Sequence, residues 1–259
     1  MIRIAEAISH IRQVISKAEL ATDPFPYLMM PDLLPTDWYA EICRRWPTGD
    51  VFRENPSMQR WDAKLPKSLG LFPAAEQPFW RDVLLLTNAA NRGIIERLRP
   101  CFAEKFEPFF GRDWERETAD MIFEIDGAQL ARYSGKVGLA PHVDHPRLVT
   151  NSFLYCPQPG ADDPTMGTVL YRSLGLALPL NLDLRPEWVR RFLRRALTTP
   201  YRANFGFAYI NSPRAFHAVD ERDIGDHDRR LLLFGSKLSK PDTARLLDLA
   251  NRPPEPAAE

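Results

Sequence analysis

The chain has 259 residues, of which 44% are hydrophobic and 11% aromatic, so it can bury the core of one large domain or two small ones. Its 34 lysine and arginine residues balance 34 aspartate and glutamate residues, and this neutrality disfavours a general nucleic-acid or membrane-surface binder. The three cysteines lack metal-site spacing, and no signal or membrane-spanning segment is visible, so we expect a cytoplasmic protein with no nucleic-acid or membrane partner.

Helical periodicity dominates the first 120 residues. Apolar residues recur there at intervals of three and four, as on the buried face of an amphipathic helix. In chain order we expect a helix over 2–20, a strand over 27–30, a helix over 36–46, a long loop over 47–73 and helices over 76–88 and 91–108.

After Gly111 the sequence changes to short β-rich runs separated by glycine, proline, asparagine and aspartate. The predicted strands cover 121–133, 148–155, 168–171, 205–210 and 230–234. Such spacing favours an α+β protein with a sandwich or jelly-roll core and helices packed on one side. We expect 1–251 to form a single domain, with a mainly helical part over 1–120 and the jelly-roll core over 121–240, followed by a disordered tail over 252–259.

One predicted helix, over 186–197, interrupts the strands. Pro186 suits its first position, and one of its faces carries four arginines, Arg190, Arg191, Arg194 and Arg195. These arginines form either a solvated face or a basic patch that faces a substrate.

The triplet His142-Val143-Asp144 is the first candidate site. In a strand, residues i and i+2 project from the same face, so the imidazole and the carboxylate would point together. His217 follows 75 residues later in an apolar, strand-like stretch. Two imidazoles and one carboxylate make the facial triad of non-haem Fe(II) enzymes, although an HxD triplet is also common by chance. His10, His145 and His227 are expected to lie on the surface or at the rim of the site.

Arg229 and Arg230 open the last predicted strand, 12 and 13 residues after His217. A guanidinium buried at the start of a strand needs an anionic partner, and its planar fork suits a carboxylate. An acidic co-substrate would supply that carboxylate.

These motifs, in this order, resemble the 2-oxoglutarate- and Fe(II)-dependent oxygenases, in the branch that includes prolyl hydroxylases and bacterial small-molecule hydroxylases. The resemblance implies a double-stranded β-helix, which is a jelly roll. The matching stretches are Asp23–Pro35, Ala128–Gly135, Pro141–Asp144, Asn151–Pro157, Gly167–Tyr171, Phe216–Val219 and Arg229–Arg230.

The resemblance implies that His142, Asp144 and His217 bind Fe(II), with 2-oxoglutarate and O2 as co-substrates. It also allows ascorbate as a reductant. The products would be succinate, CO2 and a hydroxylated substrate. Related halogenases have a small residue in place of the aspartate, so Asp144 predicts hydroxylation or a variant such as desaturation.

Five further residues are implied to bind 2-oxoglutarate. An arginine on the last strand grips its distal carboxylate, and the family pattern favours Arg229 over Arg230. Tyr155 is expected to donate a hydrogen bond to the same carboxylate, and Asn151 shares its strand face. Tyr133 either reaches the co-substrate or is a core tyrosine.

The expected substrate is a small polar or anionic molecule, such as an amino acid, a sugar or a natural-product intermediate. The predicted pocket walls are 47–73, 157–166 and the arginine helix, and they contribute Arg53, Arg60, Trp61 and Lys64. A peptidyl hydroxylase with the same core, a metal-dependent hydrolase and a non-catalytic jelly-roll binding module remain as alternatives.

Overall fold

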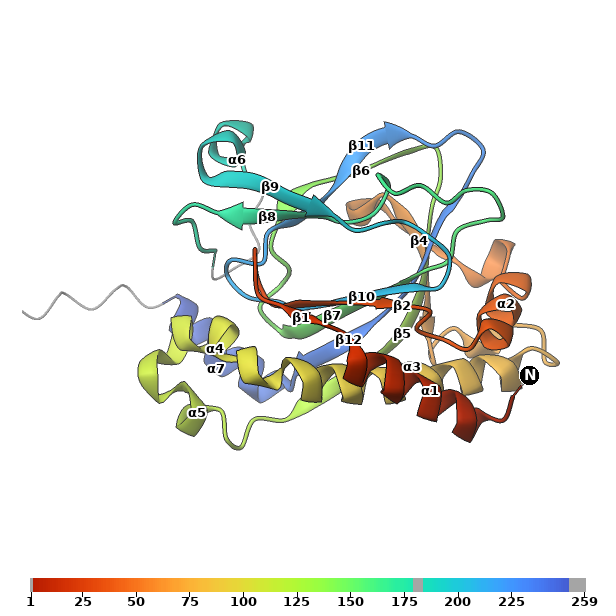
Figure 1. Cartoon of the computed structure of the whole chain (residues 1–259), viewed down its shortest axis with the longest axis horizontal. Coiled ribbons are helices and arrows are strands. Elements are labelled where there is room, and N and C mark those ends of the chain that lie inside the picture. Colours follow the sequence, from red (N-terminus) through yellow and green to blue (C-terminus); the bar gives the residue numbers. More distant parts are fainter. Residues whose placement is uncertain (1, 179–183, 252–259) are drawn as a thin grey trace, which may run out of the picture.

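Two antiparallel sheets face each other in the computed structural model, which describes residues 2–178 and 184–251 (Figure 1). Within these residues, the large sheet has the order β1 (Leu20–Ala21), β2 (Tyr27–Pro31), β10 (Phe205–Ile210), β7 (Leu148–Tyr155), β12 (Arg229–Leu238), β5 (Phe123–Tyr133), β4 (Arg60–Leu65) and β3 (Arg53–Asn55). The small sheet has the order β6 (Lys136–His142), β11 (His217–Asp223), β8 (Val169–Ser173) and β9 (Leu193–Thr198). The predicted α+β jelly roll, a double-stranded β-helix, is confirmed.

Side-chain alternation along the central strands separates two cores. In β12, Leu232 packs with the helices on the outer face of the large sheet, whereas Leu231 packs between the sheets. In β7, Leu154 and Tyr155 divide in the same way. Both strands therefore carry apolar residues on both faces, which explains why they read as nearly continuous apolar runs.

Helices cover the outer face of the large sheet (Figure 1). α1 buries Ala7, Ile11 and Ile15, which lie four residues apart and form one stripe of the helix. The α-helices of the described residues are α1 (Ile4–Lys17), α2 (Thr36–Arg44), α3 (Gln77–Leu98), α4 (Ala103–Phe110), α5 (Trp114–Glu117), α6 (Pro186–Phe192) and α7 (Lys240–Ala250). Of these, α6 lies beside β9 of the small sheet (Figure 1). Among the described residues, no helix combines the length and the apolar character needed to cross a bilayer.

The long helix α3 corrects one prediction. We expected a break between residues 88 and 91, but the helix continues because Ala90 and Asn91 are buried against its neighbours. It ends at Leu98 instead, since Pro100 cannot supply the next helical hydrogen bond, and α4 resumes at Ala103.

Two further predictions were wrong. The segment 47–73, predicted as a loop, contains the hairpin β3–β4, which pairs with β5 and extends the large sheet. The helix predicted over 186–197 ends at Phe192, and the chain continues as β9 because Leu193–Thr198 pairs with β8. Arg194 and Arg195 therefore lie on a strand and not on a helix face. The predicted tail over 252–259 lies outside the described residues.

Candidate active site

The two histidines of the predicted triad meet because their strands pair. β6 and β11 are antiparallel neighbours, and His142 and His217 are direct partners in the register. Their ring centroids lie 4.3 Å apart. Asp144 lies two residues beyond the end of β6, so the irregular chain after the strand, and not strand alternation as we predicted, brings its carboxylate to the imidazoles.

The three side chains form a compact donor set. His142 Nε2 lies 3.7 Å from Asp144 Oδ1, and His217 Nε2 lies 3.3 Å from Asp144 Oδ2. One ligand atom from each residue can be chosen so that all three lie within 4.8 Å of one another. Adjacent ligands of one octahedral ion with bonds of about 2.1 Å would lie about 3 Å apart, so the set fits a metal after a small contraction. The predicted triad is confirmed.

Backbone carbonyls orient both imidazoles. His142 Nδ1 lies 2.8 Å from the Ala140 carbonyl oxygen, and His217 Nδ1 lies 3.0 Å from that of Ala215. A carbonyl can only accept, so Nδ1 carries the proton in each neutral ring and Nε2 keeps its lone pair for a metal.

Two side chains hold the carboxylate of Asp144. Asn151 Nδ2 and the Tyr209 hydroxyl both donate to Oδ2, each at 2.5 Å. The same hydroxyl lies 3.0 Å from His217 Nε2. Asn151, which we predicted to face the co-substrate, thus contacts a metal ligand. Tyr209 was not predicted, because it is one aromatic residue in the apolar strand β10.

The charges of the donor set suit a divalent cation. Burial lowers the pKa of His217 to about 4, so its imidazole is neutral at pH 7. Burial opposes ionisation of Asp144, but the imidazoles of His217 and His142 and the Tyr209 hydroxyl outweigh it, so the pKa of this carboxyl lies well below its usual value. Two neutral imidazoles and one carboxylate would leave a bound divalent cation with a single positive charge.

A second layer fixes the turn after Asp144. Asn211 Nδ2 donates to the carbonyl oxygens of His145, at 2.9 Å, and Leu148, at 3.2 Å. The fully buried Lys105 reaches in from α4 and donates to the carbonyl oxygens of Pro146, at 2.9 Å, and Asn211, at 3.1 Å. Burial lowers the pKa of Lys105 to about 7. No sequence signal separated Lys105 from the exposed lysines of other helices.

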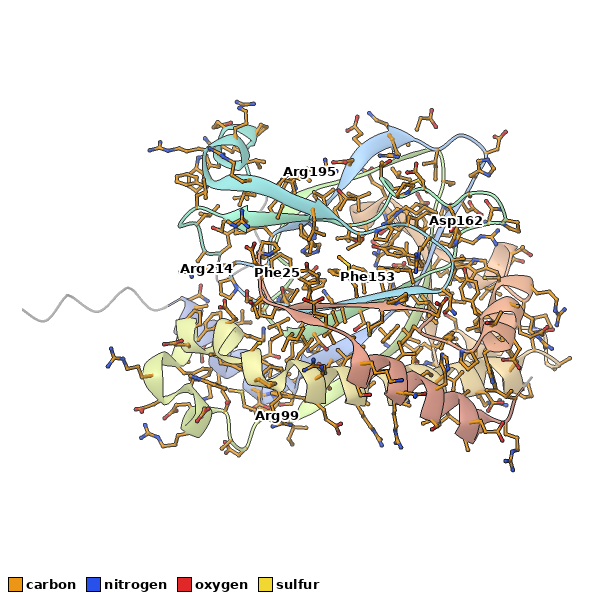
Figure 2. The ribbon with its side chains drawn as sticks, viewed as in Figure 1. Phe25, Arg99, Phe153, Asp162, Arg195 and Arg214 are labelled. Carbon is orange, nitrogen blue, oxygen red and sulfur yellow. The ribbon has the colours of Figure 1, made fainter. Side chains whose placement is uncertain are left out.

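A cavity of about 830 Å³ lies between the sheets and opens next to the triad. Its inner wall includes Phe153 of β7, whose side chain points into the space between the sheets (Figure 2). Among the described residues, the lining has one acidic side chain, Asp144, and six cationic ones, Arg60, Lys64, Lys67, Arg147, Arg229 and Lys237. Cationic side chains therefore outnumber acidic ones in the described part of the lining, although Arg60 pairs with Asp62 and Arg147 lies 3.6 Å from Glu124.

Arg229 lies in the cavity wall and is only 2% exposed. Its guanidinium carbon lies over the rings of Tyr133, Tyr155 and Tyr201, at 5.3, 5.8 and 5.6 Å from their centroids. Nε donates to the Met166 carbonyl oxygen at 3.1 Å. Aromatic faces stabilise a guanidinium, so the three rings offset part of the cost of burying this side chain.

Arg230 faces the other side of β12. Its guanidinium carbon lies 5.7 Å from the Trp46 ring centroid, and its Nη2 lies 3.5 Å from Asp228 Oδ2. It does not line the cavity. The alternation of the strand thus places one of the two candidate arginines inside and the other outside.

Tyr155 is fully buried behind the cavity lining. Its hydroxyl lies 2.8 Å from Thr168 Oγ1 and 2.7 Å from Thr199 Oγ1. Gly167 allows this arrangement, because a Cβ there would lie 1.7 Å from the Thr199 carbonyl oxygen. Thr168 lines the cavity, so its hydrogen bond with Tyr155 connects the buried tyrosine to the cavity wall.

The predicted walls are partly wrong. Met58, Arg60 and Lys64, from the segment predicted as a loop over 47–73, line the cavity, but no residue of 157–166 or 186–197 does. The four arginines of the predicted helix therefore do not face the cavity. Among the other histidines, His145 is exposed at the rim of the cavity, His227 is exposed, and His10 bonds the Asp32 carbonyl oxygen at 2.9 Å.

Solved structures of 2-oxoglutarate- and Fe(II)-dependent oxygenases match most of the chain. The non-haem α-ketoglutarate-dependent epimerase SnoN from nogalamycin biosynthesis is 13% identical at a TM-score of 0.47, over 97% of this chain and 91% of that chain. HygX from Streptomyces hygroscopicus, with nickel and 2-oxoglutarate bound, is 12% identical at 0.44, over 83% of each chain. A Pseudomonas putida prolyl-4-hydroxylase is 14% identical at a TM-score of 0.40, over 89% of this chain and 93% of that chain.

No family model and no curated protein matches the sequence. At identities of 12 to 14%, the likeness to these structures is one of fold.

Proposed function

We propose that this protein is an Fe(II)- and 2-oxoglutarate-dependent dioxygenase that hydroxylates a small anionic molecule. The observation that carries the proposal is that one cavity is lined both by the triad His142, Asp144 and His217, whose histidines lie on the small sheet, and by the buried guanidinium of Arg229 on the large sheet. A 2-oxo dicarboxylate needs both features, because one of its ends chelates a metal and the other is a carboxylate.

The protein's own residues would position the reactants. His142, Asp144 and His217 would hold the iron on one face, which leaves positions for the 2-oxo acid and dioxygen. Arg229 would bind the distal carboxylate of the co-substrate, with Tyr133 at its side and Tyr155 behind it. When bound, the iron would supply the redox chemistry that couples decarboxylation of 2-oxoglutarate to succinate and CO2 with insertion of the second oxygen atom into a C–H bond.

The cationic lining supports an anionic substrate. Arg229 and the metal would satisfy the two carboxylates of 2-oxoglutarate. Lys64 and Lys67 lie on and after β4 in the remaining wall, and among the described residues neither has an ion-pair partner. A carboxylate or phosphate on the substrate would neutralise them.

The decisive experiment is anaerobic reconstitution with Fe(II), then a screen for succinate formation under air with amino acids, sugars and peptides. Each candidate is paired with its amide or its dephosphorylated form. We expect succinate formation that requires O2, and a preference for the anionic member of a pair. Turnover that continues without O2 and 2-oxoglutarate would indicate a metal-dependent hydrolase instead. Absence of 2-oxoglutarate binding by the iron-loaded protein would refute the oxygenase.

A further inference from the structure

The hairpin β3–β4 brings a second arginine to the Arg229 end of the cavity. In the pairing of β4 with β5, Asp62 lies opposite Ala131, an inner-face residue, so alternate residues of β4 face the cavity. Arg60 and Lys64 both line it. Arg60 therefore lies in the cavity wall although its strand is near the edge of the sheet.

Buried polar partners hold the Arg60 side chain in one position. Its Nε donates to Asp62 Oδ1 at 2.8 Å, and the Asp62 side chain is only 7% exposed. Asp62 also accepts hydrogen bonds from Asn55 Nδ2 and Gln129 Nε2, each at 2.8 Å. Three donors from three strands thus converge on one carboxylate, and they fix where the guanidinium points.

The guanidinium points at Tyr133. Arg60 Nη1 donates to the Tyr133 hydroxyl at 3.1 Å, and its guanidinium carbon lies 5.9 Å from the ring centroid. Arg229 lies 5.3 Å from the same centroid. A guanidinium has no acceptor, so the Tyr133 oxygen must accept this bond and its own proton must point elsewhere. Tyr133 lines the cavity, and that proton is available to an anion next to Arg229.

We propose that Arg60 is a positioning residue for the co-substrate. It orients the Tyr133 hydroxyl as a donor to the distal carboxylate of 2-oxoglutarate, whose charge is matched by Arg229. This inference rests on the proposed function and extends it, because it assigns a role to the hairpin β3–β4 at the edge of the large sheet.

The test is the anaerobic Kd of 2-oxoglutarate for the Fe(II)-loaded protein, measured by calorimetry in a double-mutant cycle. We expect Tyr133→Phe and Arg60→Gln each to weaken binding roughly tenfold, because each removes a bond that supports a charged acceptor. In the Tyr133→Phe background, Arg60→Gln should change Kd by less than about twofold, since its effect passes through the missing hydroxyl. Arg53→Gln, an exposed arginine of the same hairpin, is the matched control and should leave Kd unchanged.

Arg60→Lys provides a second variant if Arg60→Gln does not fold. It keeps a positive charge beside Asp62, but one ammonium cannot replace the planar fork that reaches both Asp62 and Tyr133, so we again expect weaker binding. An unchanged Kd in the Arg60 variants would overturn the inference. Equal losses in both backgrounds would also overturn it, because Arg60 would then act on the ligand directly. Failure of the wild type and of Arg53→Gln to bind 2-oxoglutarate would refute the proposed function itself.

Discussion

The two ends of the cavity hold their functional groups by different means. At the metal end, directional hydrogen bonds fix each ligand: backbone carbonyls orient both histidines, and Asn151 and Tyr209 hold Asp144. At the other end, three aromatic rings surround Arg229, and one backbone carbonyl accepts from its Nε.

Under the proposed function, this difference follows from what each end would bind. A metal needs lone pairs directed at one point, so small rotations of a ligand matter. A carboxylate needs a cation whose N–H donors are not already used in other hydrogen bonds. Aromatic faces stabilise the guanidinium without occupying its N–H groups. Changes at the metal end should therefore alter metal affinity, whereas changes at the arginine end should alter co-substrate affinity alone.

The largest effect is expected from His217→Ala. Removal of one of three ligands should reduce the affinity for Fe(II) by more than about a hundredfold, beyond what loss of an outer partner costs. Calorimetry under nitrogen measures this affinity, and succinate formation should fall to the level without enzyme. The exposed His227→Ala is the control. Retained iron-dependent turnover in His217→Ala would show that the metal site is wrongly assigned.

Arg229→Gln tests the other end. Loss of a charge-assisted pair to the distal carboxylate should weaken 2-oxoglutarate binding by roughly a hundredfold, about 3 kcal/mol, with Fe(II) affinity unchanged. Arg230→Gln should leave both affinities unchanged, because its side chain points out of the cavity. The reverse result would make Arg230 the anchor.

The buried Lys105 should make the stability of the protein depend on pH. Its pKa is about 7 in the folded protein, below the 10.5 of an unburied lysine, so the unfolded chain binds more protons between these values. The metal-free protein should therefore gain stability as the pH rises, by roughly 2 kcal/mol between pH 7 and 9. Denaturant unfolding of the wild type and Lys105→Met measures this gain, and the variant should lack it. An equal slope in both proteins would mean that Lys105 is charged in the fold.

Removal of a partner of Asp144 should have a moderate effect. Tyr209→Phe or Asn151→Ala should weaken Fe(II) binding by about tenfold, because such outer partners typically contribute 10- to 100-fold. The Kd of 2-oxoglutarate, measured at saturating iron, should change little if the two ends are independent. Tyr171→Phe, which lies outside the cavity lining, serves as the control. A loss confined to 2-oxoglutarate binding would show that Tyr209 and Asn151 do not act on the metal end alone.

The smallest effect is expected for the arginines around α6. Arg190→Ser and Arg194→Ser should change succinate formation by less than about twofold, because neither side chain lines the cavity. A clear loss of turnover with anionic substrates would support the interpretation of these arginines as a basic patch that faces the substrate.

The core strands and the triad were predictable because their patterns are local or carried by motifs. β7 and β10 have the predicted bounds, since turn residues flank compact apolar runs. His142, Asp144 and His217 were found by residue type and order. The family pattern favoured Arg229 over Arg230, and the structure adds that only Arg229 of these two arginines lines the cavity.

The hairpin β3–β4 and the supports of the triad were not predictable from local pattern. β4 reads Arg-Trp-Asp-Ala-Lys-Leu and does alternate polar with apolar residues, but the run is short and contains none of the β-branched residues that are typical of strands. Lys105 and Tyr209 depend on contacts with residues 41 to 106 positions away, which no sequence window contains. β9 was hidden because its arginines continue the composition of the helix before it.

Strand β4 constrains how this protein can be re-engineered. Arg60 and Asp62 belong to the network around Tyr133, whereas Lys64 lies two residues further along the same face of the strand. A library that randomises the whole strand would mix variants that lose the co-substrate with variants that change substrate choice. Libraries that keep Arg60 and Asp62 and vary Lys64 and Lys67 should separate the two traits, so that selection for a new substrate need not also repair the co-substrate site.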